Sequence, residues 1–315
     1  MESNRTQTPV GKEFFVPNAH DKNVLALAVR DDRLASAGGD KFVVVWNISE
    51  SKQVLSLNAG VSPITFLSWD GNPNNSPRIA SLAPNDKDIR IWDIRSRRDE
   101  RIPIESGNAI GMAWNPNGNS IALLRDSSIA LYDVRQTRSL LTSRKFRDGV
   151  SDLSYILNGQ SLVIGTKNGS IEFLDPSTLE TKHTMFSHTL QLSCVRGNPK
   201  NPLQFATGGY DAIINVWETK FLTYEFSIDR QTSSIRHMSF NALGTLLATA
   251  ADKNIDVARV DAGGDLVASY TATRDIVVLT FDHSTSDNPL LAYSIEDSPH
   301  IYVQPVVPEA TTMKD

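Results

Sequence analysis

The chain has 315 residues, of which 40% are hydrophobic, and its formal net charge at pH 7 is −5. That length accommodates one large all-β domain or two ordinary domains, and the negative charge argues against a general nucleic-acid coat. A single cysteine, Cys194, excludes a disulfide framework or a cysteine metal site within the chain. No apolar run is long enough to span a membrane, and the start lacks the apolar core of a signal peptide, so we expect a cytosolic or nuclear protein.

One short phrase recurs along the chain: a turn residue, usually Asp or Asn, followed after two or three residues by a strand of alternating apolar residues. The copies are DKFVVVWN (40–47), DKDIRIWD (86–93), DSSIALYD (126–133), NGSIEFLD (168–175), DAIINVWE (211–218), DKNIDVAR (252–259) and DSPHIYVQ (297–304). Aligned on the residue after the apolar core, they are spaced by 46, 40, 42, 43, 41 and 46 residues. WD40 blades measure roughly 40–45 residues, so the spacing indicates seven such blades.

Two apolar strands precede each phrase and a more polar strand follows it. The first strands are predicted at 24–29, 64–69, 109–114, 150–155, 192–197, 235–240 and 276–281. Turn-rich connections leave no room for a helix between the strands. We therefore predict an all-β, seven-bladed WD40 β-propeller over residues 12–307, with four antiparallel strands in each blade. Residues 1–11 and 308–315 are predicted to be flexible ends.

The last repeat has only three strands, ending at IYVQPV, and would leave an unpaired edge. The segment KEFFV (12–16) at the start of the chain can supply the missing strand. We predict that it pairs as the outer strand of the seventh blade and closes the ring.

The recurring phrase carries structural residues rather than chemistry. The turn acids are Asp40, Asp86, Asp126, Asp211 and Asp252, and the large strand-end residues are Trp46, Trp92 and Trp217. An Asp at the turn can accept hydrogen bonds from the turn's own N–H groups, and a Trp fills space against the next blade. His20 and His188 precede first strands, where WD repeats often place a histidine that links the Trp and the Asp.

The sixth repeat has Ala258 where the others place a Trp, yet Asp252 keeps the turn and Ile255 and Val257 keep the strand alternation. We predict a well-formed sixth blade in which nearby apolar residues fill the space beside Ala258.

No pattern of catalytic residues stands out. The six histidines are scattered without metal-ligand spacing, no G-x-S-x-G elbow exists, and the paired glycines lie at turns and precede no helix. We expect no enzyme activity, no catalytic, cofactor-binding or metal-binding residues, no cofactor and no small-molecule substrate.

Charge is spread unevenly along the chain. Residues 87–147 hold twelve Lys or Arg against seven Asp or Glu, a local charge of +5, whereas residues 252–315 have a local charge of −7. The candidate partner-binding residues in the basic part are Arg95, Arg97, Arg98, Arg101, Arg135 and Arg138. Two interpretations stay open: charged outer strands that face water, or a basic sector that docks an acidic partner or an RNA backbone.

Asp-x-Arg follows the third strand twice, as Asp93-Ile94-Arg95 and Asp133-Val134-Arg135. This is similar to the W-D-x-R motif with which WD-repeat substrate receptors of cullin ubiquitin ligases dock on their adaptor. Tyr132 replaces the Trp in the second copy. A substrate receptor of a cullin-type ubiquitin ligase is therefore the alternative function.

The order of particular phrases resembles the THO complex subunit 3 family. The resemblance runs from about residue 18 to 306. It includes DKDIRIWDIRSRR (86–98), a third repeat without Trp-Asp and IVVLTFDHSTSDNPLLAYS (276–294), and it is strongest over 205–266. The insertion GNPNNSP (71–77) and the lack of the long basic tail of some relatives are departures from the family.

The resemblance implies a non-catalytic, nuclear scaffold subunit of the THO/TREX assembly, which couples transcription elongation to mRNA processing and mRNA export. It implies other THO subunits as partners, above all a large helical scaffold subunit, and indirectly a DEAD-box RNA helicase and an mRNA export adaptor. It offers no catalytic residues to carry over, and direct RNA contact stays open.

Overall fold

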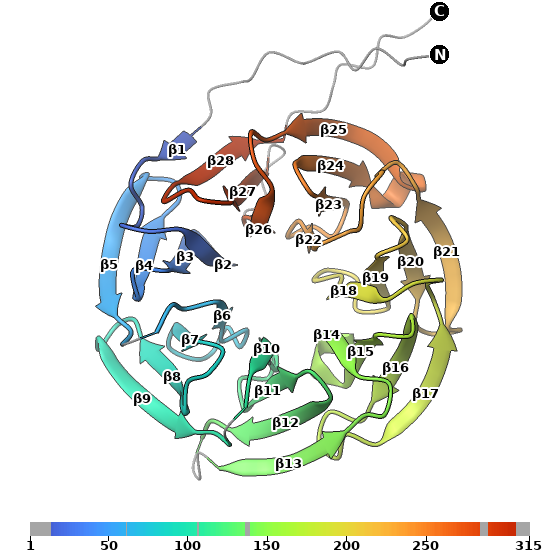
Figure 1. Ribbon diagram of the computed structural model, residues 1–315, viewed down its shortest axis with the longest axis horizontal. Helices are drawn as coiled ribbons and strands as arrows, with labels where there is room; N and C mark the ends of the chain where they lie inside the picture. Colours follow the sequence, from blue (N-terminus) through green and yellow to red (C-terminus); the bar gives the residue numbers. More distant parts are fainter. Residues whose placement is uncertain (1–13, 61, 106, 136–138, 284–288, 307–315) are drawn as a thin grey trace, which may run out of the picture.

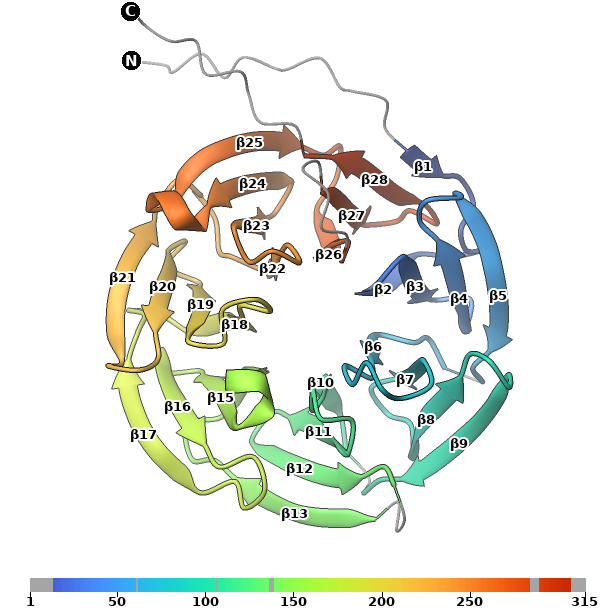
Figure 2. The same cartoon turned by 180° about the vertical axis from the view of Figure 1, so that it is seen from behind.

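The computed structural model describes residues 14–60, 62–105, 107–135, 139–283 and 289–306. The described residues form seven antiparallel sheets of four strands each. The sheets stand as blades around a central axis, with the first strand of each blade innermost (Figures 1 and 2). The predicted seven-bladed β-propeller is confirmed.

The blades take their strands in chain order. Blades 1 to 3 contain β2 (Val24–Arg30), β3 (Arg33–Gly38), β4 (Phe42–Asn47), β5 (Lys52–Asn58); β6 (Phe66–Trp69), β7 (Arg78–Leu82), β8 (Asp88–Asp93), β9 (Arg98–Pro103); and β10 (Ala109–Trp114), β11 (Ser120–Arg125), β12 (Ser128–Asp133), β13 (Leu140–Lys145). Blades 4 to 6 contain β14 (Val150–Ile156), β15 (Ser161–Thr166), β16 (Ser170–Leu174), β17 (Thr181–Phe186); β18 (Leu192–Gly197), β19 (Gln204–Gly209), β20 (Ile214–Glu218), β21 (Thr223–Ile228); and β22 (His237–Phe240), β23 (Leu246–Ala251), β24 (Asn254–Arg259), β25 (Asp265–Thr271). Blade 7 contains β26 (Ile276–Phe281), β27 (Leu290–Ile295), β28 (Ile301–Pro305) and β1 (Phe14–Val16).

The two ends of the described chain meet in blade 7. The strand β1 pairs antiparallel with β28, with Phe14 opposite Val303 and Val16 opposite Ile301. The predicted closing strand is therefore confirmed for residues 14–16, while Lys12 and Glu13 lie outside the described residues. Closure gives β28 a partner on its outer side, so the last repeat does not end in an unpaired edge there.

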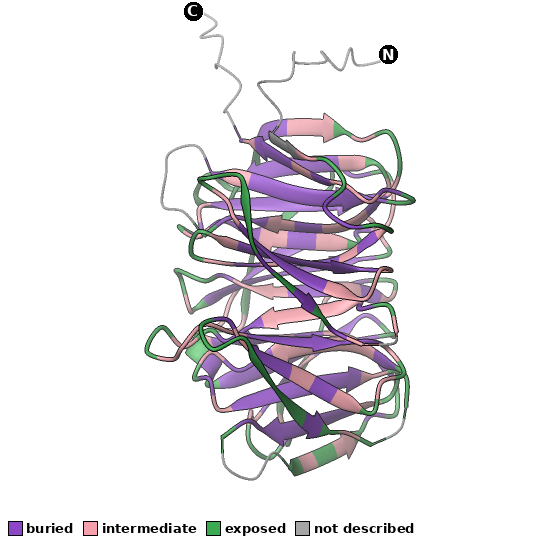
Figure 3. Cartoon of the chain, turned by 90° about the vertical axis from the view of Figure 1, so that its left-hand side faces the viewer, coloured by how far each residue is buried: buried purple, intermediate pink, exposed green. Residues whose placement is uncertain are grey.

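Antiparallel strands alternate in direction, so the turns of every blade alternate between two faces of the disc. We call "lower face" the one with the turns between first and second and between third and fourth strands. The "upper face" carries the turns between second and third strands and the links from blade to blade. Figure 3 shows the disc from its side, with buried strand segments between exposed turns.

Apolar clusters fill the space between neighbouring blades. One of them joins Trp92 and Ile79 of blade 2 to Val45 of blade 1, and another joins Ile91 to Tyr132 of blade 3. Because each blade buries one face against the previous blade and one against the next, both faces of its central strands are apolar.

The sixth blade is complete without a Trp. Strand β24 pairs with β23 and β25, and Ala258, with 2% of its surface exposed, lies opposite Leu247. Ala258 belongs to an apolar cluster that contains Phe240 and, from blade 5, Val216. The expected sixth blade and the filling of the space beside Ala258 are thus confirmed.

A left-handed residue recurs in the turn between third and fourth strands, five residues after the Trp position. It is Ser51, Arg97, Leu179, Leu222 and Gly263, with φ between 53° and 66°. Only glycine adopts this conformation without strain, so the four other residues hold it at a cost of roughly 1 kcal/mol each.

Helical structure is restricted to two single 3-10 turns, Leu157–Gly159 and Val260–Ala262, in the part of the chain that the structure describes. Within those same residues, no helix has the length and hydropathy needed to cross a membrane.

Candidate functional site

A hydrogen-bond network ties together the predicted His, Asp and Trp of blade 1. The Nδ1 atom of His20 lies 2.8 Å from Asp40 Oδ2, and its Nε2 atom lies 2.8 Å from Ser36 Oγ. Trp46 Nε1 donates to the same Ser36 Oγ at 2.8 Å. The network joins the link before β2 to strands β3 and β4, so it fixes the upper face of the blade to its core.

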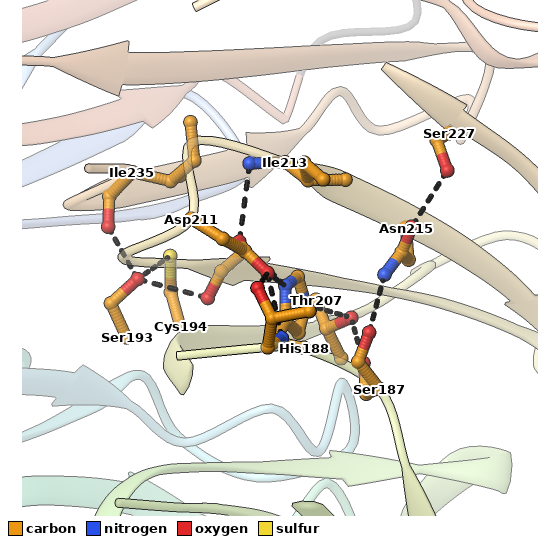
Figure 4. Close-up of polar contacts among 12 residues, drawn as sticks. Ser187, His188, Ser193, Cys194, Thr207, Asp211, Ile213, Asn215, Ser227 and Ile235 are labelled. Atoms are coloured by element: carbon orange, nitrogen blue, oxygen red, sulfur yellow. Dashed lines mark hydrogen bonds and ion pairs between the residues drawn. The ribbon is translucent and has the colours of Figure 1, made fainter. Parts of the chain in front are cut away.

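Blade 5 repeats the network with Thr207 in place of the serine (Figure 4). His188 Nδ1 lies 2.9 Å from Asp211 Oδ1, and His188 Nε2 lies 2.9 Å from Thr207 Oγ1. Trp217 Nε1 donates to Thr207 Oγ1 at 2.9 Å. The Asp211 carboxylate can only accept, so a neutral His188 imidazole carries its proton on Nδ1, and its Nε2 atom accepts from the Thr207 hydroxyl.

Burial decides the charge of both histidines. It lowers the pKa of His20 and of His188 below 6.5, and the neighbouring carboxylates of Asp40 and Asp211 offset only part of this. Burial also raises the pKa of Asp211, but hydrogen bonds from His188 and from the Thr189 and Ile213 N–H groups outweigh it, so that pKa ends below its usual value. At neutral pH a neutral imidazole therefore donates to a carboxylate in blades 1 and 5.

The other predicted turn acids are held differently. Asp126 of blade 3 forms an ion pair with Lys167 of blade 4. Asp252 lies 3.7 Å from Arg236 Nε within blade 6, and Asp86 closes its turn through its backbone N–H to the Ala83 carbonyl at 3.1 Å. These blades have no histidine in the link before the first strand. Among the described residues, the full network therefore forms only in blade 1, with His20, and in blade 5, with His188.

The predicted basic residues that the structure describes lie on the lower face and outer edge of blades 2 and 3. Arg95 and Arg97 occupy the turn between β8 and β9, where Asp93 Oδ1 accepts from the N–H groups of Arg95 (2.9 Å) and Ser96 (2.8 Å). Arg135 follows β12 in blade 3, and its guanidinium lies 3.3 Å from Asp133 with 58% of the side chain exposed. The carboxylates thus order the turns, and the cationic side chains face outward.

A cavity of about 570 Å³ lies between blades 2 and 3 on the lower face, and Arg98 and Arg135 both line it. Arg78, Asp93 and Glu100 also contribute to its walls. The structure therefore brings together two arginines that are 37 positions apart in the chain. The cavity is polar and of mixed charge rather than purely basic.

Strand alternation separates Arg101 from this cavity. Arg98 and Glu100 share one face of β9, and Arg101 lies on the other face, where it is 3.6 Å from Asp99 and 55% exposed. Arg138 lies outside the described residues. The six predicted residues therefore do not form one continuous patch within the described part of the structure.

Sequence reasoning missed Arg78, which joins blades 2 and 3 beside the cavity. Its guanidinium lies 2.6 Å from Asp70, which is completely buried, and stacks over the Trp114 ring at 5.1 Å. A further hydrogen bond of 3.4 Å reaches the Gly118 carbonyl. The insertion 71–77 lies between Asp70 and Arg78, so the ion pair of these two residues closes the inserted loop.

Reactive groups are not gathered anywhere in the described residues: no three His, Cys, Asp or Glu side chains come together as a possible metal site there. Cys194 is buried, and burial raises the pKa of its thiol to about 12. A thiol with such a pKa is protonated at neutral pH and is a poor nucleophile.

Comparison with known proteins agrees with this geometry. The WD domain, G-beta repeat family matches residues 179–218, which include the first three strands of blade 5, β18 to β20, and the whole hydrogen-bond network of His188, Thr207, Asp211 and Trp217. THO complex subunit 3 of Arabidopsis thaliana is 30% identical over 253 residues, which cover 78% of this chain and 78% of that protein. The chain belongs to the THO complex subunit 3 family.

Other similar proteins share the WD architecture. WD repeat-containing protein AAC3 of Dictyostelium discoideum is 25% identical over 72% of this chain and 52% of its own length. The β-propeller domain of Cps50 (Swd1) from Myceliophteria thermophila superposes with a TM-score of 0.76 at 18% identity, over 91% of this chain and 97% of that domain. The latter likeness shows the fold alone. A WD-repeat propeller of the THO complex subunit 3 family points to a scaffold rather than to a catalyst.

Proposed function

We propose that this chain is a non-catalytic, nuclear scaffold subunit of a THO complex, in which it docks protein partners during co-transcriptional mRNP assembly and mRNA export. The observation that carries the proposal is the identity to a THO complex subunit 3, which extends over 78% of both chains rather than over one repeat. A propeller suits this role because its closed ring holds surface turns in fixed positions.

The basic residues of blades 2 and 3 are the proposed partner site. Arg95, Arg97 and Arg98 are exposed, and Arg98 shares the cavity between the blades with Arg135. Exposed cations steer association with an acidic surface more than they add to affinity. The partner we propose is an acidic surface of the large helical scaffold subunit of THO. A DEAD-box RNA helicase and an mRNA export adaptor join indirectly.

Affinity purification of the tagged chain from nuclear extract tests the assignment to THO. The other THO subunits are expected in stoichiometric amounts. Recovery of a cullin adaptor in their place, with no THO subunit, contradicts the proposal and favours the ubiquitin-ligase receptor.

A charge-reversal variant tests the site itself. The combination Arg95→Glu, Arg98→Glu and Arg135→Glu is expected to weaken THO assembly at least tenfold while the melting temperature stays near that of the parent. The matched control is Lys52→Glu, Lys220→Glu and Lys253→Glu, which makes the same change in charge at exposed positions of blades 1, 5 and 6. Equal assembly of the two variants rules out the proposed site.

The alternative function has its own test. Changing Arg95 and Arg135 to Ala removes both Asp-x-Arg guanidinium groups and abolishes cullin-adaptor binding if the chain is a substrate receptor. THO assembly that weakens in the same variant, without any adaptor binding in the parent, excludes the receptor.

A further inference from the structure

The three arginines in the cavity between blades 2 and 3 differ in how their charges are used. Arg78 is committed to the seam between the blades, because it pairs with the buried Asp70. Arg98 is exposed, and no carboxylate of the described residues lies within ion-pair distance of it. Arg135 lies beside Asp133 but keeps 58% of its side chain exposed. Two guanidinium groups, one from each blade, are therefore available to a ligand.

Hydrogen bonds to the backbone hold the two turns that carry these guanidinium groups. Asp93 Oδ1 accepts from the Ser96 N–H at 2.8 Å in the turn directly before Arg98. Asp133 Oδ1 accepts from the N–H of Arg135 itself at 2.6 Å. Because the backbone of both turns is already ordered, a ligand that binds the two arginines has to immobilise only their side chains, which lowers the entropic cost of binding.

The polar walls of the cavity favour a polypeptide over a free small molecule. Among the described residues that line it, Ile91 is the only large apolar side chain, and it is 2% exposed. Small-molecule sites are lined mostly by apolar and aromatic side chains. The neutral lining residues Asn75, Ser96 and Asn119 add amide and hydroxyl groups. A polar cavity of about 570 Å³ at the surface suits side chains that a partner inserts from outside.

The charge balance of the walls favours a single carboxylate over a nucleic-acid strand. Asp93 and Glu100 lie in the same walls as the three arginines, and Asp70 balances the charge of Arg78. Nucleic-acid affinity depends on several Lys or Arg that neutralise successive phosphates, and the two wall carboxylates repel such a polyanion. A guanidinium forms two parallel hydrogen bonds with one carboxylate, so Arg98 can hold a single Asp or Glu side chain.

We infer that the cavity between blades 2 and 3 binds an acidic peptide segment of a partner and takes one of its Asp or Glu side chains between Arg98 and Arg135. The inference rests on the proposed function, because the lower face of blades 2 and 3 is the partner site of that function. It deepens that function, since one inserted carboxylate, rather than the overall positive charge of the two blades, recognises the partner.

Site-specific photo-cross-linking in nuclei identifies what occupies the cavity in complexes of the full chain. The probe is p-benzoylphenylalanine in place of Asn119, which lines the cavity, and the control position is Lys220, which is exposed in the lower-face turn between β20 and β21. We expect position 119 to cross-link a protein segment that contains Asp or Glu, and position 220 to cross-link a different segment or none. Replacing the Asp and Glu residues of that segment by Asn and Gln should lower the yield about tenfold.

Three arginine variants separate an inserted carboxylate from general charge attraction. Arg98→Ala is expected to lower the yield of the cross-link about tenfold. Arg101→Ala removes the same charge from the opposite face of β9 and should lower the yield about twofold at most. Arg98→Lys keeps the charge but loses the planar fork, so it should behave like Arg98→Ala. Melting temperatures near that of the parent exclude a folding effect in each variant.

The inference is overturned by the absence of a cross-link from position 119, by a cross-link to RNA or to a segment without Asp or Glu, or by equal yields in Arg98→Ala and Arg101→Ala. Membership of THO is read separately, from co-purification of the other subunits. A cross-link that depends on Arg98 but joins a protein outside THO contradicts the proposed function and supports the acidic ligand of the cavity. Co-purification with THO without this cross-link refutes the cavity alone.

Discussion

Substituting Thr207 by Val removes the centre of the blade 5 network and keeps the shape of the side chain. The hydroxyl group accepts from Trp217 Nε1 at 2.9 Å and donates to His188 Nε2 at 2.9 Å. Thr207 is completely buried, so water cannot replace the lost partner without a rearrangement. The variant leaves one buried donor and one buried acceptor unsatisfied.

The expected cost follows from those two orphaned groups. Each unsatisfied buried polar group costs about 1–3 kcal/mol, so Thr207→Val, which leaves two such groups, is expected to lower the free energy of unfolding by roughly 2–6 kcal/mol. Thr249→Val is the matched control, because Thr249 has the same place in blade 6, where Ala258 replaces the Trp. Its hydroxyl makes one hydrogen bond, to the Asp256 carbonyl at 3.3 Å. That variant is expected to cost about 1 kcal/mol.

Urea unfolding followed by tryptophan fluorescence measures both variants. The midpoint of Thr207→Val should fall clearly below that of Thr249→Val, with similar slopes for the two transitions. Equal midpoints for the two variants would refute the reasoning, since they would mean that the Trp217 and His188 bonds add nothing. A cost below about 1 kcal/mol for Thr207→Val would do the same.

Two further predictions concern the turn of blade 2 and the response to acid. Arg97→Gly is expected to be more stable than Arg97→Ala by about 1 kcal/mol. Both variants lack the guanidinium, but only glycine adopts the left-handed φ of 58° without strain. Urea midpoints compare the two variants, and equal midpoints would mean that this turn stores no strain. Stability is expected to fall as pH drops below 6.5, because the folded-state pKa values of His20 and His188 lie below their unfolded values and the unfolded chain binds the extra protons first. The urea midpoint between pH 7 and pH 5 should depend less on pH in His188→Gln, and an unchanged dependence would exclude His188 as a contributor.

Most of the fold was predictable from local pattern. The Asp turns and the alternation in 40–47, 86–93 and 211–218 repeat at the period of one blade, and the segment 12–16 was needed to complete the last one. Each blade keeps these patterns because it has to bury two apolar faces against its neighbours and connect its strands by tight turns. The chain from 252 to 259 kept these signals without its Trp, and the structure places it in a complete sheet.

The candidate site was predictable only in part. The sequence indicates a basic excess at 87–147, but residue types do not say which side chains share a face. The alternation of β9 and the seam with blade 3 place Arg98 and Arg135 on one cavity and turn Arg101 away from it. Arg78 became visible only through its contacts with Asp70 and Trp114.

The sequence by itself determined the number of blades, the order of their strands and the closure of the ring, because all three follow from periodicity and from the unpaired edge of the last repeat. Only the tertiary structure decided which turn acids are held by a histidine and which arginines meet between blades. Those features depend on contacts between adjacent blades, where residues from separate turns meet at distances that the repeat pattern does not encode.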